Sequence, residues 1–185
     1  MKGAYFEMNA IRNEKLTVSD QTQVETFITK ARIGHLGVTD GDVPYVVPLN
    51  YAYYNDQLYF HGANEGKKVR IIKENNQACF SICEEYGTMV DPVPAKTDTA
   101  YMSVMIFGEI EEVTDLDEAT QAMQMMIDKY VPGYYERAVR KSHVQNYRSS
   151  VGASTAVYRI APQTITAKAN PLDEAIAFFS RSTRP

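Results

Sequence analysis

The sequence predicts a mainly β fold with peripheral α-helices, an α+β class, in a single domain spanning residues 1–185. Runs rich in Val, Tyr, Ile and Phe alternate between two faces, most clearly in residues 57–61 and 101–113. About four other segments carry apolar residues at helical spacing. The chain has 185 residues, 44% of them hydrophobic, which suits one globular core, and no repeat or linker divides it. We expect an N-terminal arm of about residues 1–18 and a C-terminal tail of about residues 170–185.

Charge and composition exclude several classes of protein. The net charge of −4 argues against a nucleic-acid-binding surface. No run is apolar enough to span a membrane, and Met1–Ala10 contains Glu7 and lacks the apolar core of a signal peptide. The expected location is therefore the cytoplasm. Cys79 and Cys83, the only cysteines, are expected to be buried thiols, and with three scattered histidines they do not make a metal site.

The first elements are a helix and a strand. Ser19 or Asp20 is a suitable N-cap for a helix that continues to about Arg32. Residues 34–39 alternate and contain two glycines, which predicts a short strand. Residues 40–42, Asp-Gly-Asp, are typical of a turn.

Residues 45–68 are the centre of the prediction. Residues 45–54 suit a strand, Asn55 and Asp56 suit a tight turn, and residues 57–61 return as the second arm of a hairpin. Alternation places neighbouring side chains on opposite faces, with Tyr59 and His61 on one and Leu58 and Phe60 on the other.

A helix is expected to start after Gly66 and to end near Asn75 and Asn76. Its first residues are Lys67 and Lys68, followed by an apolar face. A helix N-terminus presents unpaired N–H groups and the positive end of the helix dipole, so this basic start suits a phosphate. A solvated basic turn is the alternative interpretation.

The next predicted elements are a strand, a loop and a long strand. Residues 77–83 form the first strand, and residues 86–98, with one glycine and two prolines, predict a loop that is either a rim or lid or simply disordered. Residues 101–113 form the long strand. Both of its faces are largely apolar, as expected if one lines a barrel and the other packs on a partner.

The last part of the chain predicts two helices and a strand. One helix starts at Asp115 or Asp117 and ends before the break at residues 132–133, Pro-Gly. Residues 134–149 predict a second helix with a basic face, which is either solvated or an anion-binding surface; its basic residues are Arg137, Arg140, Lys141 and His143. Residues 155–168 predict the final strand.

Four motifs in this order resemble the pyridoxamine 5'-phosphate oxidase-like flavin-binding split barrels. They are Pro44–Tyr51 (PYVVPLNY), Leu58–Ala63 (LYFHGA), Gly66–Lys68 (GKK) and Tyr101–Gly108 (YMSVMIFG). The similarity covers roughly residues 30–130, and within this family the chain most resembles the branch of 5-nitroimidazole resistance (Nim-type) proteins.

The resemblance implies a split β-barrel that forms a homodimer, with one flavin mononucleotide (FMN) at each of two sites across the interface. Lys68 corresponds to a lysine that binds the flavin phosphate, and Lys67 to a neighbouring basic position. The implied cofactor-binding residues are Val46, Val47, Pro48, Leu49, Asn50, Tyr51, His61, Gly62, Ala63, Gly66, Lys67, Lys68 and Ser103.

Three positions depart from the oxidase branch. Gly66 stands where that branch often has serine, Val46 replaces a phosphate-binding arginine, and Ser103 replaces a ring-contacting glutamine. These differences argue against true pyridoxamine phosphate oxidation and favour the Nim-like branch.

The expected function is therefore that of an FMN-dependent oxidoreductase of nitroreductase type acting on a small molecule. His61 is the candidate catalytic residue, because a histidine can transfer a proton near neutral pH while the flavin transfers electrons. The alternative role of His61 is that of a neutral histidine that hydrogen-bonds the flavin without taking part in catalysis. The alternatives are a non-catalytic flavin-binding or sequestering protein, or a split barrel that binds deazaflavin or haem, with His61 as haem ligand.

Overall fold

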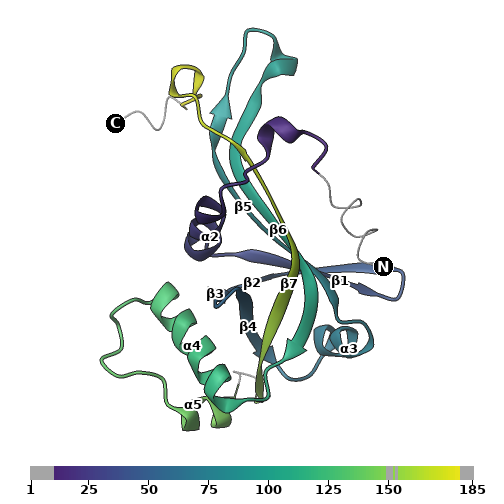
Figure 1. The fold of residues 1–185 in the computed structure, drawn as a ribbon, viewed down its shortest axis with the longest axis vertical. Coiled ribbons are helices and arrows are strands. Elements are labelled where there is room, and N and C mark those ends of the chain that lie inside the picture. Colours follow the sequence, from purple (N-terminus) through teal and green to yellow (C-terminus); the bar gives the residue numbers. More distant parts are fainter. Residues whose placement is uncertain (1–10, 149–151, 153, 180–185) are drawn as a thin grey trace.

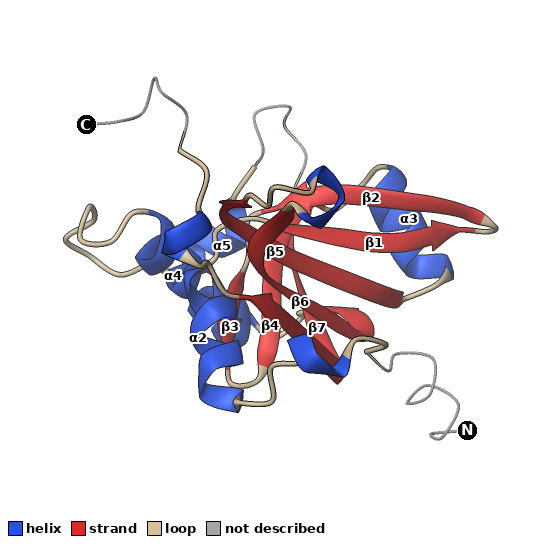
Figure 2. Ribbon diagram, turned by 90° about the horizontal axis from the view of Figure 1, so that it is seen from above, coloured by secondary structure: helices blue, strands red, loops and turns tan. Residues whose placement is uncertain are grey.

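The computed structural model describes residues 11–148, 152 and 154–179 of the chain. Seven antiparallel strands form one curled sheet in the order β2-β1-β5-β6-β7-β4-β3, a split β-barrel with helices outside it (Figures 1 and 2). The fold class expected from the sequence is confirmed. The strands are β1 (Gly34–Asp40), β2 (Val43–Leu49), β3 (Ala52–Tyr54), β4 (Gln57–Ala63), β5 (Gln77–Met89), β6 (Asp98–Glu112) and β7 (Thr155–Asn170).

The helices lie on two sides of the sheet. Figure 1 shows α3 on one side of β4 and β7, with α4 and α5 on the other. The helices are α2 (Gln21–Lys30), α3 (Lys67–Glu74), α4 (Leu116–Tyr130) and α5 (Lys141–Asn146), and three 3-10 turns are η1 (Glu14–Leu16), η2 (Pro94–Lys96) and η3 (Glu174–Ile176).

The first half of the chain follows its local signals, with one break. Asp20 caps α2 by accepting a hydrogen bond from the Gln23 amide at 3.2 Å. Asn55 and Asp56 both adopt left-handed backbone, with φ of 47° and 57°, in the turn between β3 and β4. The prediction of one strand over residues 45–54 is wrong at Asn50–Tyr51, because the Tyr51 amide donates to the Tyr130 hydroxyl at 2.9 Å instead of to a sheet partner.

The β5–β6 hairpin is longer than predicted. Residues 86–89 belong to β5, and residues 87–89 pair with the start of β6, so the predicted loop over residues 86–98 is wrong at both ends. The register shifts at Gly87, whose φ of 138° suits a bulge that lets the pairing continue. The tail docks on this hairpin: Met89 pairs with Ala177, and the Phe178 amide donates to the Thr88 carbonyl at 2.8 Å.

The predicted helix over residues 134–149 is mostly wrong. Only Lys141–Asn146 is helical among its described residues, and residue 149 lies outside them. A turn at residues 132–133 precedes the segment. The Val139 amide donates to Gln124 Oε1 of α4 at 2.7 Å, and this contact fixes the non-helical part of the segment against α4. The position of this segment therefore depends on α4.

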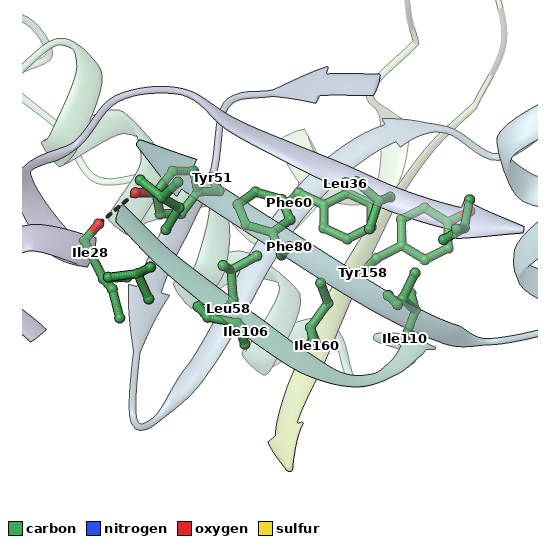
Figure 3. Close-up of a cluster of buried hydrophobic side chains, with 14 of the residues drawn as sticks. Ile28, Leu36, Tyr51, Leu58, Phe60, Phe80, Ile106, Ile110, Tyr158 and Ile160 are labelled. Carbon is green, nitrogen blue, oxygen red and sulfur yellow. Dashed lines mark hydrogen bonds between the residues drawn. The ribbon is translucent and has the colours of Figure 1, made fainter. Parts of the chain in front are cut away.

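Inward-facing side chains of the sheet and of α2 and α3 form the main core. Figure 3 shows the aromatic residues at its centre, where Phe60 stacks on Tyr158 with ring centroids 5.3 Å apart. The Tyr51 hydroxyl donates to the Ile28 carbonyl at 2.7 Å (Figure 3). The expectation of two buried thiols is wrong for Cys83, which is exposed on the outward face of β5, whereas Cys79 is half-buried.

At the N-terminus, the prediction about Met1–Ala10 lies outside the described residues, while Thr17 pairs with Lys168 of β7. Within residues 11–148, 152 and 154–179, no helix combines the length and apolar character needed to cross a membrane. In the same part of the chain, no three His, Cys, Asp or Glu side chains gather where they could hold a metal ion.

Candidate functional site

The N-terminus of α3 lies directly beyond the end of β4. Gly66, at its N-cap, has a φ of +100°, a conformation that L side chains rarely adopt. No side chain caps this helix end. The first-turn amides are therefore open to an anion, as predicted from the sequence.

The Lys68 side chain folds back over the end of β4. Its Nζ lies 2.6 Å from where a Cβ at Gly62 would be, so the glycine leaves the space that the ammonium occupies. Nζ also lies 5.3 Å from the centre of the Phe60 ring. Burial lowers the pKa of Lys68, and no described residue forms a hydrogen bond or ion pair with its ammonium. A half-buried cation in this state is strongly stabilised by a bound anion.

Lys67 already has a partner. Its Nζ lies 3.4 Å from Asp40 Oδ2 and 4.8 Å from the centre of the Tyr45 ring. Arg70 Nη2 donates to the same carboxylate oxygen at 2.8 Å, and the hydrogen bonds from Arg70 and Lys67 hold the pKa of Asp40 below its ordinary value. The two neighbouring lysines are thus not equivalent, and Lys68 is the one available to a ligand. No sequence signal pointed to Asp40, which was assigned only to a turn.

His61 faces α4, on the opposite side of β4 from Gly62. Its Nδ1 lies 3.2 Å from Met126 Sδ, and no other described residue makes a hydrogen bond to the ring. Burial, and to a smaller extent the positive charge of Lys68, lower the pKa of His61, so the ring is neutral at pH 7. Sequence reasoning missed Met126, which was assigned to the core.

The predicted residues of β2 divide between two faces. Val46 and Pro48 point outward, and Val46 is 60% exposed, whereas Val47 and Leu49 pack against the main core. Tyr51 is fully buried, so its side chain is part of the core. The side chains that β2 presents to a ligand are therefore those of Val46, Pro48 and Asn50, which follows it.

Ser103 lies far along the sheet from the end of β4, but only two residues from Met105, which shares a row across β5 and β1 with Pro48 of β2. It pairs with Lys168 of β7, whereas His61 pairs with Val157 of the same strand. These two β7 positions are eleven residues apart, which is about 37 Å of strand at about 3.4 Å per residue. Within one chain, Gly62, Gly66, Lys67 and Lys68 therefore lie close together, and Ser103 is remote from them. Ala63 is the last residue of β4 and pairs with Thr155.

The fold and the site define a split β-barrel protein with an open, basic helix N-terminus at the end of β4. The chain belongs to the family described as pyridoxamine 5'-phosphate oxidase, whose sequence profile matches residues 20–169. A comparison with curated proteins gives no match.

Three solved structures illustrate the similarity. A candidate 5-nitroimidazole antibiotic resistance protein from Bacteroides thetaiotaomicron is 25% identical, with a TM-score of 0.63 over 83% of this chain and 86% of that chain. The flavocytochrome Anf3 from Azotobacter vinelandii is 21% identical, with a TM-score of 0.73 over 95% and 86% of the two chains. The FAD- and haem-binding protein from Mycobacterium smegmatis is 16% identical, with a TM-score of 0.68 over 86% and 77%. The last two support the fold alone.

Proposed function

We propose that this protein binds a flavin, specifically FMN, and acts as a flavin-dependent oxidoreductase of nitroreductase type on a small molecule. The observation that carries the proposal is the half-buried ammonium of Lys68, which has no partner among the described residues and lies at an uncapped helix N-terminus. Membership of the family and the 25% identity to the candidate nitroimidazole resistance protein support it.

The residues present fit the phosphate of FMN. Lys68 and the first amides of α3 supply donors, and Gly62 leaves the space in which the ammonium sits. Lys67 contributes only if it leaves Asp40. The rest of the cofactor is proposed to contact the outward groups of Val46, Pro48 and Asn50, at and just after β2, together with the end of β4 and Ser103.

A bound flavin supplies the electron transfer, and the protein supplies positioning and protons. His61 is the proposed proton carrier. Met126 Sδ can only accept a hydrogen bond, so the contact at Nδ1 places the proton of the neutral ring there and leaves Nε2 as the nitrogen that takes up a proton and passes it on. Because its pKa is lowered, the ring is neutral at pH 7 and is suited to accept a proton there.

We propose further that two copies of the chain form the complete site. Ser103 is remote from Lys68 within one chain, so a site that uses both needs a second copy. The outward face of the sheet is apolar in places: Val43 and Val46 of β2 are 59% and 60% exposed, and Met105 of β6 is 40% exposed. Apolar side chains on such a face suit a protein interface. Light scattering coupled to size-exclusion chromatography would give twice the 20.9 kDa chain mass for a dimer.

The first experiment is a visible absorption spectrum of the purified protein, taken before and after incubation with FMN and desalting. Flavin absorption bands that remain after incubation with FMN and desalting, but not after incubation with riboflavin and desalting, support the proposal. A Soret band would instead favour the haem alternative. Retention of neither chromophore would overturn the proposed cofactor.

A second experiment separates an enzyme from a flavin-sequestering protein. The FMN-loaded protein is given a reduced nicotinamide and a 5-nitroimidazole, and substrate loss is followed over many equivalents of protein. Sustained turnover that falls in His61→Asn while FMN remains bound supports the proposed role of His61. Tight FMN binding without turnover for a panel of nitro compounds and donors would favour the sequestering protein.

A further inference from the structure

A hollow lies on the α4 side of β4 and β7, away from Lys68. Its volume is about 770 Å³, within the usual range for small-molecule sites. Met123 and Ile127 of α4 and Val157 of β7 line it, and the segment between α4 and α5 contributes Tyr134 and Tyr135. Both of these tyrosines are exposed, at 75% and 59%. The hollow is thus an open pocket with apolar walls and aromatic side chains at its mouth.

The charged side chains of this pocket favour an anion. Arg137 and Arg140 both line it, and neither forms an ion pair with any described residue. This differs from Lys141 and Arg159, which are paired with carboxylates of α4 or β6. Glu136 is the only acidic residue among those that line the pocket.

The walls of the pocket are held in place by specific contacts. Val139, between the two arginines, is fixed to Gln124 of α4 by its amide hydrogen bond at 2.7 Å. Lys141 of α5 forms an ion pair with Asp117 at the start of α4. These contacts attach the C-terminal end of the arginine-bearing segment to α4, and its N-terminal end follows directly from the last turn of α4, where the Tyr134 amide donates to the Val131 carbonyl at 3.1 Å.

The pocket is distinct from the proposed phosphate site. Lys68 lies over Gly62, whereas the pocket lies on the other face of β4, beside His61. Val157, at the pocket wall, is the strand partner of His61, and Met126 of α4 packs on the histidine ring. Neither His61 nor Met126 is among the residues that line the pocket.

We propose that this pocket binds a flat aromatic molecule that carries a carboxylate, with the ring among the apolar and tyrosine side chains and the carboxylate at Arg137 and Arg140. Planar guanidinium groups pair with carboxylates through two parallel hydrogen bonds, and tyrosine faces suit stacking on an aromatic ring. This binding requires neither flavin nor turnover.

The test is the affinity of the full-length protein for 2-naphthoate and for the uncharged 2-naphthamide, measured by calorimetry. The acid should bind at least about tenfold more tightly than the amide, as expected for a charge-assisted hydrogen bond. The Arg137→Ala/Arg140→Ala protein should lose this difference, while Arg12→Ala, which removes an arginine elsewhere, should keep it. In spectra of protein with ¹³C-labelled methionine methyl groups, Met123 should shift and Met102 should not.

The proposal would be overturned by no binding of the acid, by equal binding of acid and amide, or by an unchanged preference in the double variant. Binding that is lost in Lys68→Ala but kept in the double variant would place the acid at the phosphate site and would also overturn it. Because the assay contains no flavin, failure of the proposed cofactor would leave this test unaffected.

Discussion

Replacing Gly62 or Lys68 by alanine tests the candidate phosphate site at two adjoining positions. Lys68→Ala removes the ammonium. Gly62→Ala keeps the lysine but places a methyl group 2.6 Å from the present position of Nζ, well inside contact distance. Because the clash involves the far end of a flexible side chain, we expect the lysine to move and the fold to remain.

The expected losses follow from the value of one charge-assisted hydrogen bond. Such a bond contributes about 1.5–3 kcal/mol, and about 1.4 kcal/mol corresponds to tenfold in affinity. Lys68→Ala should therefore weaken FMN binding by about 10-fold to 100-fold. Gly62→Ala should cost less, about 3-fold to 10-fold, because the displaced ammonium retains part of its attraction to the phosphate. Riboflavin, which lacks the phosphate, should bind the three proteins equally.

The assay is a titration of flavin fluorescence with apo-protein, performed in parallel with FMN and riboflavin. Lys73→Ala is the matched control, because it removes an exposed lysine from the other end of α3. Thermal unfolding of each variant without flavin shows whether the fold is kept.

Equal losses of FMN and riboflavin affinity in Lys68→Ala would refute the reasoning, because they would place the lysine at the ring and not at the phosphate. Unchanged FMN binding in Lys68→Ala would refute it as well. A Gly62→Ala protein that binds FMN like the original would show that the ammonium does not need its present position.

Further predictions concern buried polar and titratable groups. Tyr51→Phe should lower the free energy of unfolding by about 1 kcal/mol in urea titrations, because it loses a buried hydrogen bond. Tyr158→Phe should be neutral or stabilising, because its buried hydroxyl has no partner among the described residues. Destabilisation of both variants, or of neither, would contradict this. The lowered pKa of His61 means that the unfolded chain takes up its proton first as pH falls, so the protein should lose stability below about pH 6.5, and His61→Asn should lose less; parallel pH profiles would argue against this. Burial lowers the pKa of Lys129 to about 8, so its Cε signal should titrate near that pH by ¹³C NMR; a midpoint above pH 10 would exclude it.

The elements that the sequence predicted well have strong local signals. Asp20 caps a helix, residues 55–56 make a left-handed turn, and Gly66 precedes a helix with a basic start, because each depends on residues only a few positions apart. The prediction of one helix over residues 134–149 is wrong, because the position of this segment depends on the hydrogen bond between Val139 and Gln124, a contact that no local sequence pattern reveals.

The candidate site shows the same division. Its basic helix start and the facing of His61 follow from local spacing, since alternation along a strand and amides at a helix end are properties of the backbone. Contacts between distant parts of the chain gave the rest: Asp40 engages Lys67, Gly62 makes room for Lys68, and Met126 covers one nitrogen of His61. Which lysine is available, and which state His61 adopts, depend on burial and on neighbours from other strands and helices. The order and curl of the sheet determine both.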